Sequence, residues 1–337
     1  MQFPEGFVEK YEKILGDEAR DFLASFGEEA VSAFRVNPLK EIPISFPDAI
    51  PQTPWGHYGK ISGKSPEHAT GLVYSQEPAA QMVAQVAQPS PGMKVLDLAA
   101  APGGKSTQLA AYLAGEGLLV SNEISSKRAK ILVENMERFG ATNVVVTNES
   151  ADRLAKVFKG YFDLIVLDAP CSVEGMFRKQ PDAMDYWSLD YPSQCASLQR
   201  EILADAVTML AEGGHLVYST CTWSPEENEE IVNWLLEEYD FDLLPVEHIN
   251  GMVAGIDLPE TARMYPHHFK GEGQFVAHLQ FKGDNPAPKF KASKSNLSRE
   301  QLTLWQEFAQ KHLKVNLRGI LQTFGDQLYL LPELLPD

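Results

Sequence analysis

Apolar residues recur at helical spacing near the start of the chain. Phe7 and Tyr11, and then Phe22 and Phe26, follow one another at intervals of four residues, the period of a helix that buries one face. The next segment is RVNPLKEIPISFPDAIPQTPWG, whose prolines exclude a long helix and favour extended edges and turns. The pattern predicts a small α+β unit over residues 1–75 that begins with two short helices.

From Met93 onward, short apolar strands alternate with longer helical segments. The strand-like segments are KVLDL, GLLVSNE, NVVVT, DLIVLD and HLVYST, and the helical ones include SKRAKILVENMERFG and LQREILADAVTMLA. This alternation is typical of a parallel sheet with helices on both faces. The predicted fold class is α/β, with the sheet in residues 76–282. Such sheets bind ligands at the carboxyl ends of their strands.

The last part of the chain predicts a short C-terminal extension. GQFVAHLQF reads as a final strand, and DNPAPKFKASKSN has the composition of a polar linker. Residues 298–337 predict an amphipathic helix and a strand pair around residues 324–331. Because few residues remain for a core, we expect residues 283–337 to form a truncated or dependent unit.

Charge and hydropathy limit the classes of protein to which the chain can belong. The formal net charge of -17 argues against a protein coated with a nucleic-acid-binding surface. Lys282 to Arg318 is an exception, with eight basic residues against three acidic ones, and it is either a solvated segment or an RNA-facing patch. No long apolar run or secretion signal occurs, so we expect a cytoplasmic protein with no membrane partner.

The segment VLDLAAAPGGKST places a strand, a turn of small residues and a helix start in succession. Small residues let a ligand approach the backbone, and helix N-terminal amides suit an anionic group; the alternative is a turn needed only for packing. A phosphate loop, GxxxxGK[ST], matches at Gly104 to Ser106 but has Ala99 in place of its first glycine, and the dinucleotide pattern GxGxxG is absent. Glu123, at the end of the next strand, can accept hydrogen bonds from a ribose diol. S-adenosylmethionine, which has a ribose but no phosphate, fits best.

Two of the three cysteines follow strands of the predicted sheet. The cysteines are too few and too widely spaced for a disulfide framework or a CxxC zinc site. Cys195 lies in a helical pattern and is expected to be structural. Cys171 follows LIVLDAP and Cys221 follows HLVYST, so both thiols can converge on one ligand at the strand ends.

A thiol pair beside a methyl donor suits chemistry on cytosine. Addition of a thiolate to C6 makes C5 able to attack a sulfonium methyl group. The reaction also needs a donor to the ring at N3 or the exocyclic amine, and a base for the C5 proton. Asp168, if protonated or sharing a proton, could serve the ring, with help from Lys105. One cysteine would attack and the other would help release the product, but the residues alone do not rank them.

The motifs DLAAAPGGKST, NEISSKR, DAPCSVEG, FRKQPD and STCTWSPEENE together resemble those of the Nop/Sun family of RNA cytosine-5 methyltransferases. RVNPLK, SQEPAAQM and MYPHHFKGEGQFVAHLQ extend the resemblance over about residues 1–282. The resemblance implies the Rossmann-like sheet of an S-adenosylmethionine-dependent methyltransferase, preceded by an N-terminal RNA-binding unit. Because the N-terminus is short, as in bacterial members of the family, the resemblance also implies 16S ribosomal RNA as the substrate. Such members commonly continue into a PUA-like RNA-binding domain, which residues 283–337 would begin. We expect a monomer.

The resemblance implies a role for each matching residue. Glu123 would hold the ribose of S-adenosylmethionine, and Arg128 is a further cofactor contact. Asp168 lies where cofactor and base meet, Cys221 corresponds to the nucleophile, and Cys171 to the cysteine required for release. The turn that would cradle the amino-acid end of the cofactor comprises Ala99, Ala100, Ala101, Pro102, Gly103, Gly104 and Lys105.

The chain departs from the family pattern at two places. Relatives commonly carry an aspartate near the adenine where this chain has Ser150, and Glu149 or Asp152 would take over. The late motif often reads GFF but here reads GQF, residues 273–275, a change expected to matter little.

Several residues are candidate RNA contacts, because cations grip phosphates and aromatic rings stack on bases. The alternative for those in FRKQPDAMDYWS is a solvated loop with anchoring aromatics. The candidates are Arg178, Lys179, Tyr186 and Trp187 and, on the resemblance alone, Arg35 and Asn37. Four histidines show no ligand spacing with cysteine or acidic partners, so no metal is expected; they are His215, His267, His268 and His278.

Three rival functions remain at this point. A tRNA cytosine-5 methyltransferase would share the same chemistry. An RNA-binding ribosome-assembly factor without turnover is disfavoured because the candidate catalytic set, Cys171, Cys221, Asp168 and Lys105, is intact. A DNA cytosine methyltransferase would place its nucleophile at Cys171, in the Pro-Cys pair, and would need an ENV-type motif that the sequence lacks.

Overall fold

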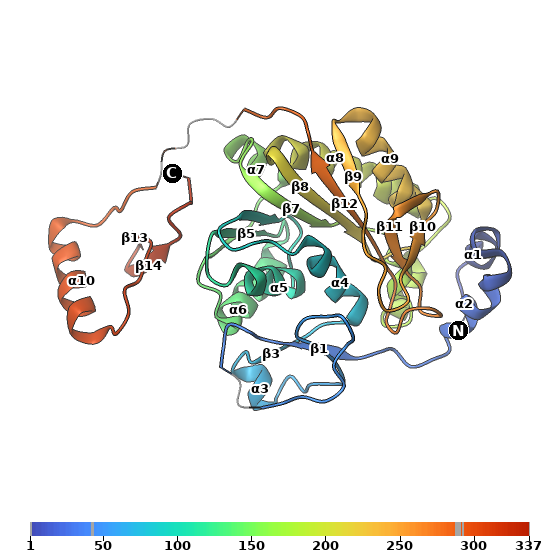
Figure 1. The fold of residues 1–337 in the computed structure, drawn as a ribbon, viewed down its shortest axis with the longest axis horizontal. Coiled ribbons are helices and arrows are strands. Elements are labelled where there is room, and N and C mark those ends of the chain that lie inside the picture. Colours follow the sequence, from blue (N-terminus) through green and yellow to red (C-terminus); the bar gives the residue numbers. More distant parts are fainter. Residues whose placement is uncertain (1, 42–43, 287–290, 292, 337) are drawn as a thin grey trace.

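The computed structural model describes residues 2–41, 44–286, 291 and 293–336. Its centre is a sheet in the order β10-β11-β12-β8-β7-β4-β5-β6, with β9 pairing β12 (Figure 1). The strands β4 to β8 pair in parallel, as the alternating pattern predicts. They span Lys94–Asp97 (β4), Leu118–Asn122 (β5), Val144–Thr147 (β6), Phe162–Asp168 (β7) and Leu210–Thr220 (β8).

Helices cover both faces of this sheet, as predicted. Adjacent strand residues such as Ile165 and Val166 belong to different apolar clusters, because successive side chains point to opposite faces. One cluster includes residues of α7 (Ala151–Val157), α8 (Tyr191–Met209) and α9 (Glu229–Glu238). The other includes residues of α4 (Pro78–Ala87), α5 (Gly104–Leu113) and α6 (Ser126–Phe139).

The sheet is mixed rather than wholly parallel. The predicted late strand, β12 (Gln274–Phe281), runs antiparallel to β8 and lies between β8 and β11. The sequence pattern missed three antiparallel strands because they are short or interrupted by proline and glycine. These are β9 (Phe241–Leu244), β10 (Val253–Gly255) and β11 (Leu258–Met264). Of these, β11 pairs with the start of β12, next to the end of β8, whereas β9 pairs with the end of β12.

The N-terminal residues form a helical pair and a separate small sheet. The two predicted helices, α1 (Phe7–Leu15) and α2 (Ala19–Ser25), are confirmed and are joined by a 3-10 turn, η1 (Gly16–Glu18). The sheet contains β1 (Ala33–Val36), β2 (Gly56–Tyr58) and β3 (Val73–Ser75), with the short helix α3 (Pro66–Ala69) before β3. In Figure 1 the helical pair lies beside β10 and β11, whereas β1 and β3 lie below α4 and α6.

An aromatic cluster joins the helical pair to the main domain. Phe7 and Phe22 are fully buried, and they pack on Trp187, Trp223 and neighbouring rings. Both tryptophans belong to segments that follow the cysteines along the chain, so the helical pair buttresses the region around the two thiols. Short 3-10 turns occur in the same segments, namely η2 (Glu174–Met176), η3 (Pro181–Tyr186) and η4 (Pro225–Glu227).

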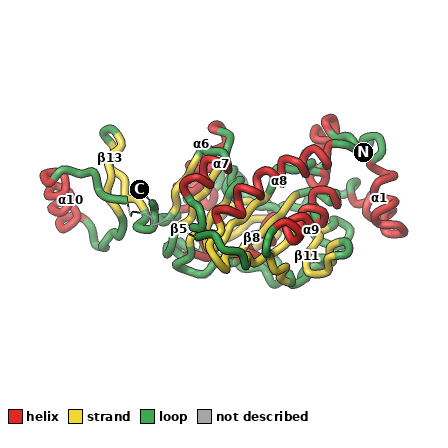
Figure 2. The backbone as a smooth tube through the Cα atoms, turned by 90° about the horizontal axis from the view of Figure 1, so that it is seen from above, coloured by secondary structure: helices red, strands yellow, loops and turns green. Residues whose placement is uncertain are grey.

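The C-terminal segment contains the predicted helix and strand pair. They are α10 (Arg299–His312), β13 (Ile320–Phe324) and β14 (Gln327–Leu331). In Figure 2 this segment lies at one end of the molecule and α1 at the other. No helix within the described residues combines the length and apolar composition that a membrane crossing requires.

Candidate active site

The two candidate thiols meet where β7 and β8 end. Asp168 pairs with Ser219 in the parallel ladder, so the segments that carry the cysteines leave the sheet side by side. The sulfur atoms of Cys171 and Cys221 are 3.4 Å apart. Cys171 is buried, whereas Cys221 is partly exposed. The sequence therefore predicted the juxtaposition of these thiols from strand ends alone.

The environment distinguishes the two thiols. The hydrogen bond with Cys221, followed by burial, raises the pKa of Cys171 well above its ordinary value. Cys171 is thus held as a protonated thiol near neutral pH, while Cys221 faces the cavity with more access to solvent. The third cysteine, Cys195, lies in α8, and burial raises its pKa to about 12. Of the three, Cys221 is the most accessible to solvent.

Asp168 contacts polar groups from α5 and from β8. Lys105, at the start of α5, places its Nζ 2.7 Å from Oδ2 of Asp168. Ser219 donates its hydroxyl to Oδ1 at 2.7 Å. Burial alone would lower the pKa of Lys105, but Asp168, with Asp97 and Cys221, raises that pKa above its ordinary value. Lys105 therefore remains a cation beside the thiols.

Two glycines fix the backbone next to Cys221. The amide of Gly175 donates to the Cys221 carbonyl at 2.9 Å, and the amide of Gly273 donates to the Gly175 carbonyl at 3.0 Å. A Cβ atom added to Gly175 would lie 2.6 Å from Cα of Gly273, and one added to Gly273 would lie 2.3 Å from the Trp223 ring. Only residues without side chains permit this close approach.

Two buried carboxylates lie behind the thiols, and sequence analysis missed both. Glu227 accepts from the Ser172 amide and from Nε2 of Gln199, each at 2.9 Å, and also from the Ser172 hydroxyl. Burial, with the nearby Glu174, raises the pKa of Glu227 to about 8. Acidic residues in SVEG and SPEENEE gave no periodic signal of burial, because acidic side chains are ordinarily exposed.

The second carboxylate ties the N-terminal helix α1 to the cysteine segments. Glu174 is fully buried and accepts from Lys10 at 3.2 Å, from Trp187 at 2.8 Å and from the Tyr11 hydroxyl. It also accepts from Thr222, directly after Cys221, at 2.9 Å. Burial of a carboxylate is tolerated only when such donors surround it. The helical pair therefore contributes to the site by holding Glu174.

A cavity of about 400 Å³ opens in front of the thiols. Its lining includes seven of the residues expected at the site: Ala99, Ala101, Glu123, Arg128, Asp168, Cys171 and Cys221. The other expected residues are not part of the lining: Ala100, Pro102, Gly103, Gly104 and Lys105. Arg128 donates to the Ala101 carbonyl at 2.6 Å and lies 3.5 Å from Oε2 of Glu123, which links the glycine turn to the acidic residue.

The cavity lining includes one of the two acidic residues expected near the adenine. Glu149 lines the cavity together with the apolar side chains of Ile124 and Ile202. Asp152 does not line it, because its carboxylate accepts from Ser150 at 2.5 Å and from Lys156 at 3.1 Å on an exposed surface. Of the two alternatives, only Glu149 can contact a ligand in this cavity.

The expectation that Arg35 and Asn37 help position RNA is wrong, because both side chains are fully buried. Nη2 of Arg35 donates to the Gly104 carbonyl and to Thr107, each at 2.7 Å. Asn37 donates to the carbonyls of Gly71 and Phe139. Arg35 instead braces the first turn of α5 from the small N-terminal sheet.

The candidate RNA contacts in FRKQPDAMDYWS divide into buried and accessible ones. Arg178 forms a buried ion pair with Glu272 at 3.0 Å and donates to the Ser25 carbonyl, so it joins α2 to the loop before β12. Trp187 is 6% exposed, and its indole donates to Glu174. These two residues cannot serve RNA as expected. Lys179 is partly exposed and Tyr186 is 80% exposed, so both can be reached by RNA.

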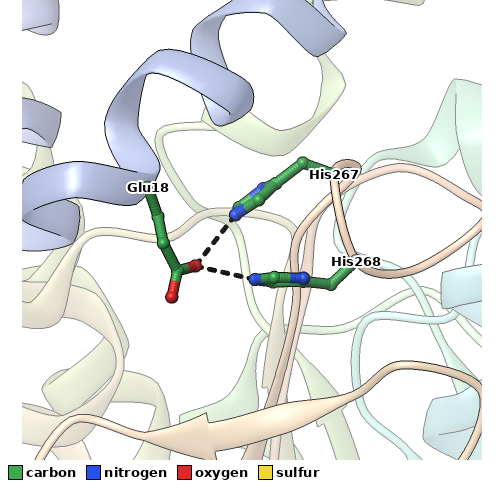
Figure 3. A group of neighbouring side chains, drawn as sticks. All are labelled: Glu18, His267 and His268. Carbon is green, nitrogen blue, oxygen red and sulfur yellow. Dashed lines mark hydrogen bonds and ion pairs between the residues drawn. The ribbon is translucent and has the colours of Figure 1, made fainter.

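The expectation that the histidines lack acidic partners is wrong at one place. Oε2 of Glu18 lies 3.2 Å from Nε2 of His267 and 2.7 Å from Nε2 of His268 (Figure 3). Within the described residues, this is the one group of three metal-ligand side chains whose ligand atoms converge. Hydrogen bonds from both imidazoles to one carboxylate oxygen account for the contact, which ties η1 to the loop before β12.

Comparison with known proteins assigns both parts of the chain. Residues 84–280 match the family described as 16S rRNA methyltransferase RsmB/F, and residues 3–78 match the N-terminal domain of 16S rRNA methyltransferase RsmF. The ribosomal RNA small subunit methyltransferase F of Erwinia tasmaniensis is 34% identical, over 94% of this chain and 72% of that protein. The protein of the same name from Escherichia coli is 34% identical, over 86% of this chain and 66% of that one.

Solved structures show the same fold. A methyltransferase homologue from Pyrococcus horikoshii has a TM-score of 0.72 and 30% identity, and the match covers 82% of this chain and 94% of that one. NSun6 from Pyrococcus horikoshii, solved with SFG, has a TM-score of 0.73 and 23% identity, with coverage of 84% and 99%. The Rossmann-like methyltransferase fold implied by the sequence motifs is confirmed.

The Arg35 brace leads to a first prediction. Arg35→Met should weaken binding of S-adenosylmethionine about tenfold, because loss of two hydrogen bonds loosens the first turn of α5. Isothermal titration calorimetry measures this dissociation constant. Arg20→Met, at an exposed position of α2, is the matched control and should bind as the wild type does. A folded Arg35→Met protein with unchanged cofactor affinity but weakened RNA binding would contradict the brace.

The buried Glu227 leads to a second prediction. Because its pKa in the folded protein, about 8, lies above the unfolded value, the folded state retains the proton. The resulting stability is fully present below the unfolded pKa and is lost as the pH rises through about 8. Between about pH 6 and pH 9, the unfolding free energy of the wild type should fall on the order of 2 kcal/mol more than that of Glu227→Gln.

Urea unfolding at a series of pH values measures this difference. Glu230→Gln, at an exposed position of helix α9, which directly follows the η4 turn that contains Glu227, should follow the wild-type curve. Parallel curves for the wild type and Glu227→Gln would show that Glu227 holds no extra proton in the folded state.

Proposed function

The chain belongs to the 16S rRNA methyltransferase RsmB/F family, and from this premise we propose that it methylates C5 of cytosine in 16S ribosomal RNA through a covalent Cys221 adduct. The chain is an S-adenosylmethionine-dependent RNA methyltransferase. The observation that carries the finer proposal is the convergence of Cys171 and Cys221, 3.4 Å apart, on the cavity that also contains Glu123 and Asp168. A methyltransferase that used no covalent adduct would have no need for two thiols there.

The cavity suits S-adenosylmethionine. Glu123 provides carboxylate oxygens for ribose hydroxyls, while Leu98, Ile124 and Ile202 provide apolar surface for a purine ring. Ala99 and Ala101 leave space beside the turn that precedes α5 for an amino-acid end. When bound, S-adenosylmethionine supplies an electrophilic methyl group. We propose that Pro102 and Gly103 contact the cofactor through the backbone of the same turn. Gly104 would do so from the start of α5.

The chemistry begins at Cys221. Its thiolate adds to C6 of cytosine and forms a C–S bond, while Lys105 and Asp168 hold a proton at N3 of the ring. The negative charge that develops on the ring is thereby neutralised, and C5 gains enamine character. C5 would then form its bond to the methyl group while the bond from that methyl to the sulfonium sulfur breaks, and the sulfur would leave as a neutral thioether. The cation Lys105, which Asp168 orients, stabilises the ring throughout this step.

Release of the product depends on Cys171. The C5 proton must leave while the C–S bond to Cys221 breaks, and the departing sulfur then needs a proton. Cys171 is a protonated thiol within hydrogen-bond distance of that sulfur, so it can give its proton to Cys221. The resulting Cys171 thiolate takes the C5 proton, and the proton held at N3 returns to Lys105 and Asp168, so both cysteines end as thiols. The greater burial of Cys171 and the partial exposure of Cys221 support this division of roles.

RNA recognition would use the candidate basic and aromatic side chains that are exposed to solvent. Residues 1–75 support the site, residues 76–282 carry the chemistry, and residues 283–337 add positive charge. In the basic segment, the exposed cations within the described residues are Lys282, Lys291, Lys294, Arg299, Lys311, Lys314 and Arg318. Lys289 of the same segment falls outside the described residues. We propose that these cations, with Lys179 and Tyr186, contact RNA, and that a monomer acts in the cytoplasm, where ribosomal RNA is present.

The function is tested by methyl transfer to defined RNA. The purified protein is incubated with methyl-labelled S-adenosylmethionine and undermodified 16S ribosomal RNA, free or in small subunits, and with tRNA as a competing substrate. We expect label in 16S RNA as 5-methylcytosine, mapped by nuclease digestion and mass spectrometry. Cys221→Ala should lower the label by at least about a thousandfold, because the nucleophile is lost. Label only in tRNA, or on a base other than cytosine, would refute the proposal.

A further inference from the structure

We propose that Gln274 is a positioning residue for methyl transfer, which holds the Asp168 carboxylate in register with Cys221. The inference rests on the proposed function, since it gives Asp168 a partner in that reaction. Gln274 is the first residue of β12 and is 2% exposed. Its Nε2 donates to Oδ1 of Asp168 at 2.9 Å.

The contact completes the set of donors around Asp168. Oδ1 accepts from Ser219 and Gln274, and Oδ2 lies against the Lys105 ammonium. Without Gln274, Oδ1 would keep only the Ser219 hydroxyl, and the carboxylate would be freer to rotate about its bond to Cβ. A carboxylate that must orient Lys105 and meet a cytosine ring needs a fixed plane, because a small misplacement of a reacting group costs much of the rate.

The backbone around Gln274 is itself clamped to the nucleophile. Gly273, directly before it, donates to the Gly175 carbonyl, and Gly175 donates to the carbonyl of Cys221. Glu272, one residue earlier, is held by the buried ion pair with Arg178. One short segment therefore fixes both the Cys221 backbone and the Asp168 carboxylate. We infer that Gln274 sets the position of the base-facing carboxylate relative to the thiol.

The identity of the residue matters because of its amide. Phenylalanine, which the late motif often carries at this position, has no group that can donate to Asp168. The expectation that the change from GFF to GQF matters little took no account of this contact. In this chain, the carboxamide supplies a hydrogen bond that an aromatic ring in the same place would not.

Single-turnover kinetics test the inference. At saturating S-adenosylmethionine and 16S RNA, Gln274→Met should lower the rate of 5-methylcytosine formation about tenfold, because it keeps the length of the side chain but removes the donor. Gln274→Phe should lose a similar factor. The dissociation constant for S-adenosylmethionine should stay within about twofold of the wild-type value, since Gln274 does not line the cavity. Gln280→Met, farther along β12, is the matched control and should retain full rate.

The pH dependence of the Gln274→Glu rate distinguishes a positioning role of Gln274 from a merely structural one. The introduced carboxyl repels Asp168 when it is ionised and donates to it when it is protonated. The ratio of its rate to the wild-type rate should therefore rise as the pH falls from about 8 to about 6. This arm also decides the matter if Gln274→Met fails to fold.

The outcomes separate the two proposals. A wild-type protein that forms no 5-methylcytosine would overturn the proposed function and this inference with it. An active wild type with a fully active Gln274→Met would overturn only the role of Gln274. Two further results would assign Gln274 a structural role and likewise overturn the inference. One is a loss of S-adenosylmethionine affinity in Gln274→Met as large as its loss of rate. The other is a ratio of the Gln274→Glu rate to the wild-type rate that does not change with pH.

Discussion

The site depends on the parallel pairing of β7 with β8. The ladder that places Asp168 opposite Ser219 also places the two cysteine segments next to each other. A shift of this register by one residue would turn Asp168 to the other face of the sheet and separate it from Lys105. The strand cores are fully buried on both faces, and this burial fixes the register. The reactive geometry is therefore a consequence of core packing.

Two buried carboxylates further fix the segments that carry the cysteines. Glu174 and Glu227 are surrounded by donors, and each is joined to a residue adjacent to one of the cysteines. Glu174 also receives Lys10 and Tyr11 from the N-terminal helix α1. Buried carboxylates contribute little net stability, but they specify one arrangement of their partners. Helix α1 thereby helps to fix the active-site residues that contact Glu174.

Much of this arrangement could be predicted from sequence where the signal is local. Strand and helix periodicity located the parallel strands, and strand ends located Cys171 and Cys221. Burial of polar residues could not be predicted, since Arg35 and Glu174 belong to residue types that are ordinarily exposed. The contact between Gln274 and Asp168 joins residues 106 positions apart in the chain. It depends on β12 inserting antiparallel beside β8, and no local pattern specifies that insertion.

The central claim, that Cys221 attacks cytosine and Cys171 releases it, can be tested by mapping the trapped adduct. Cys171→Ala is incubated with RNA substrate and S-adenosylmethionine, denatured and digested, and the RNA-linked peptide is sequenced by mass spectrometry. Cys195→Ala serves as the control and should trap nothing. The account predicts a denaturation-resistant adduct in Cys171→Ala, with the nucleotide on Cys221. An adduct that instead accumulates in Cys221→Ala, with the nucleotide on Cys171, would contradict it.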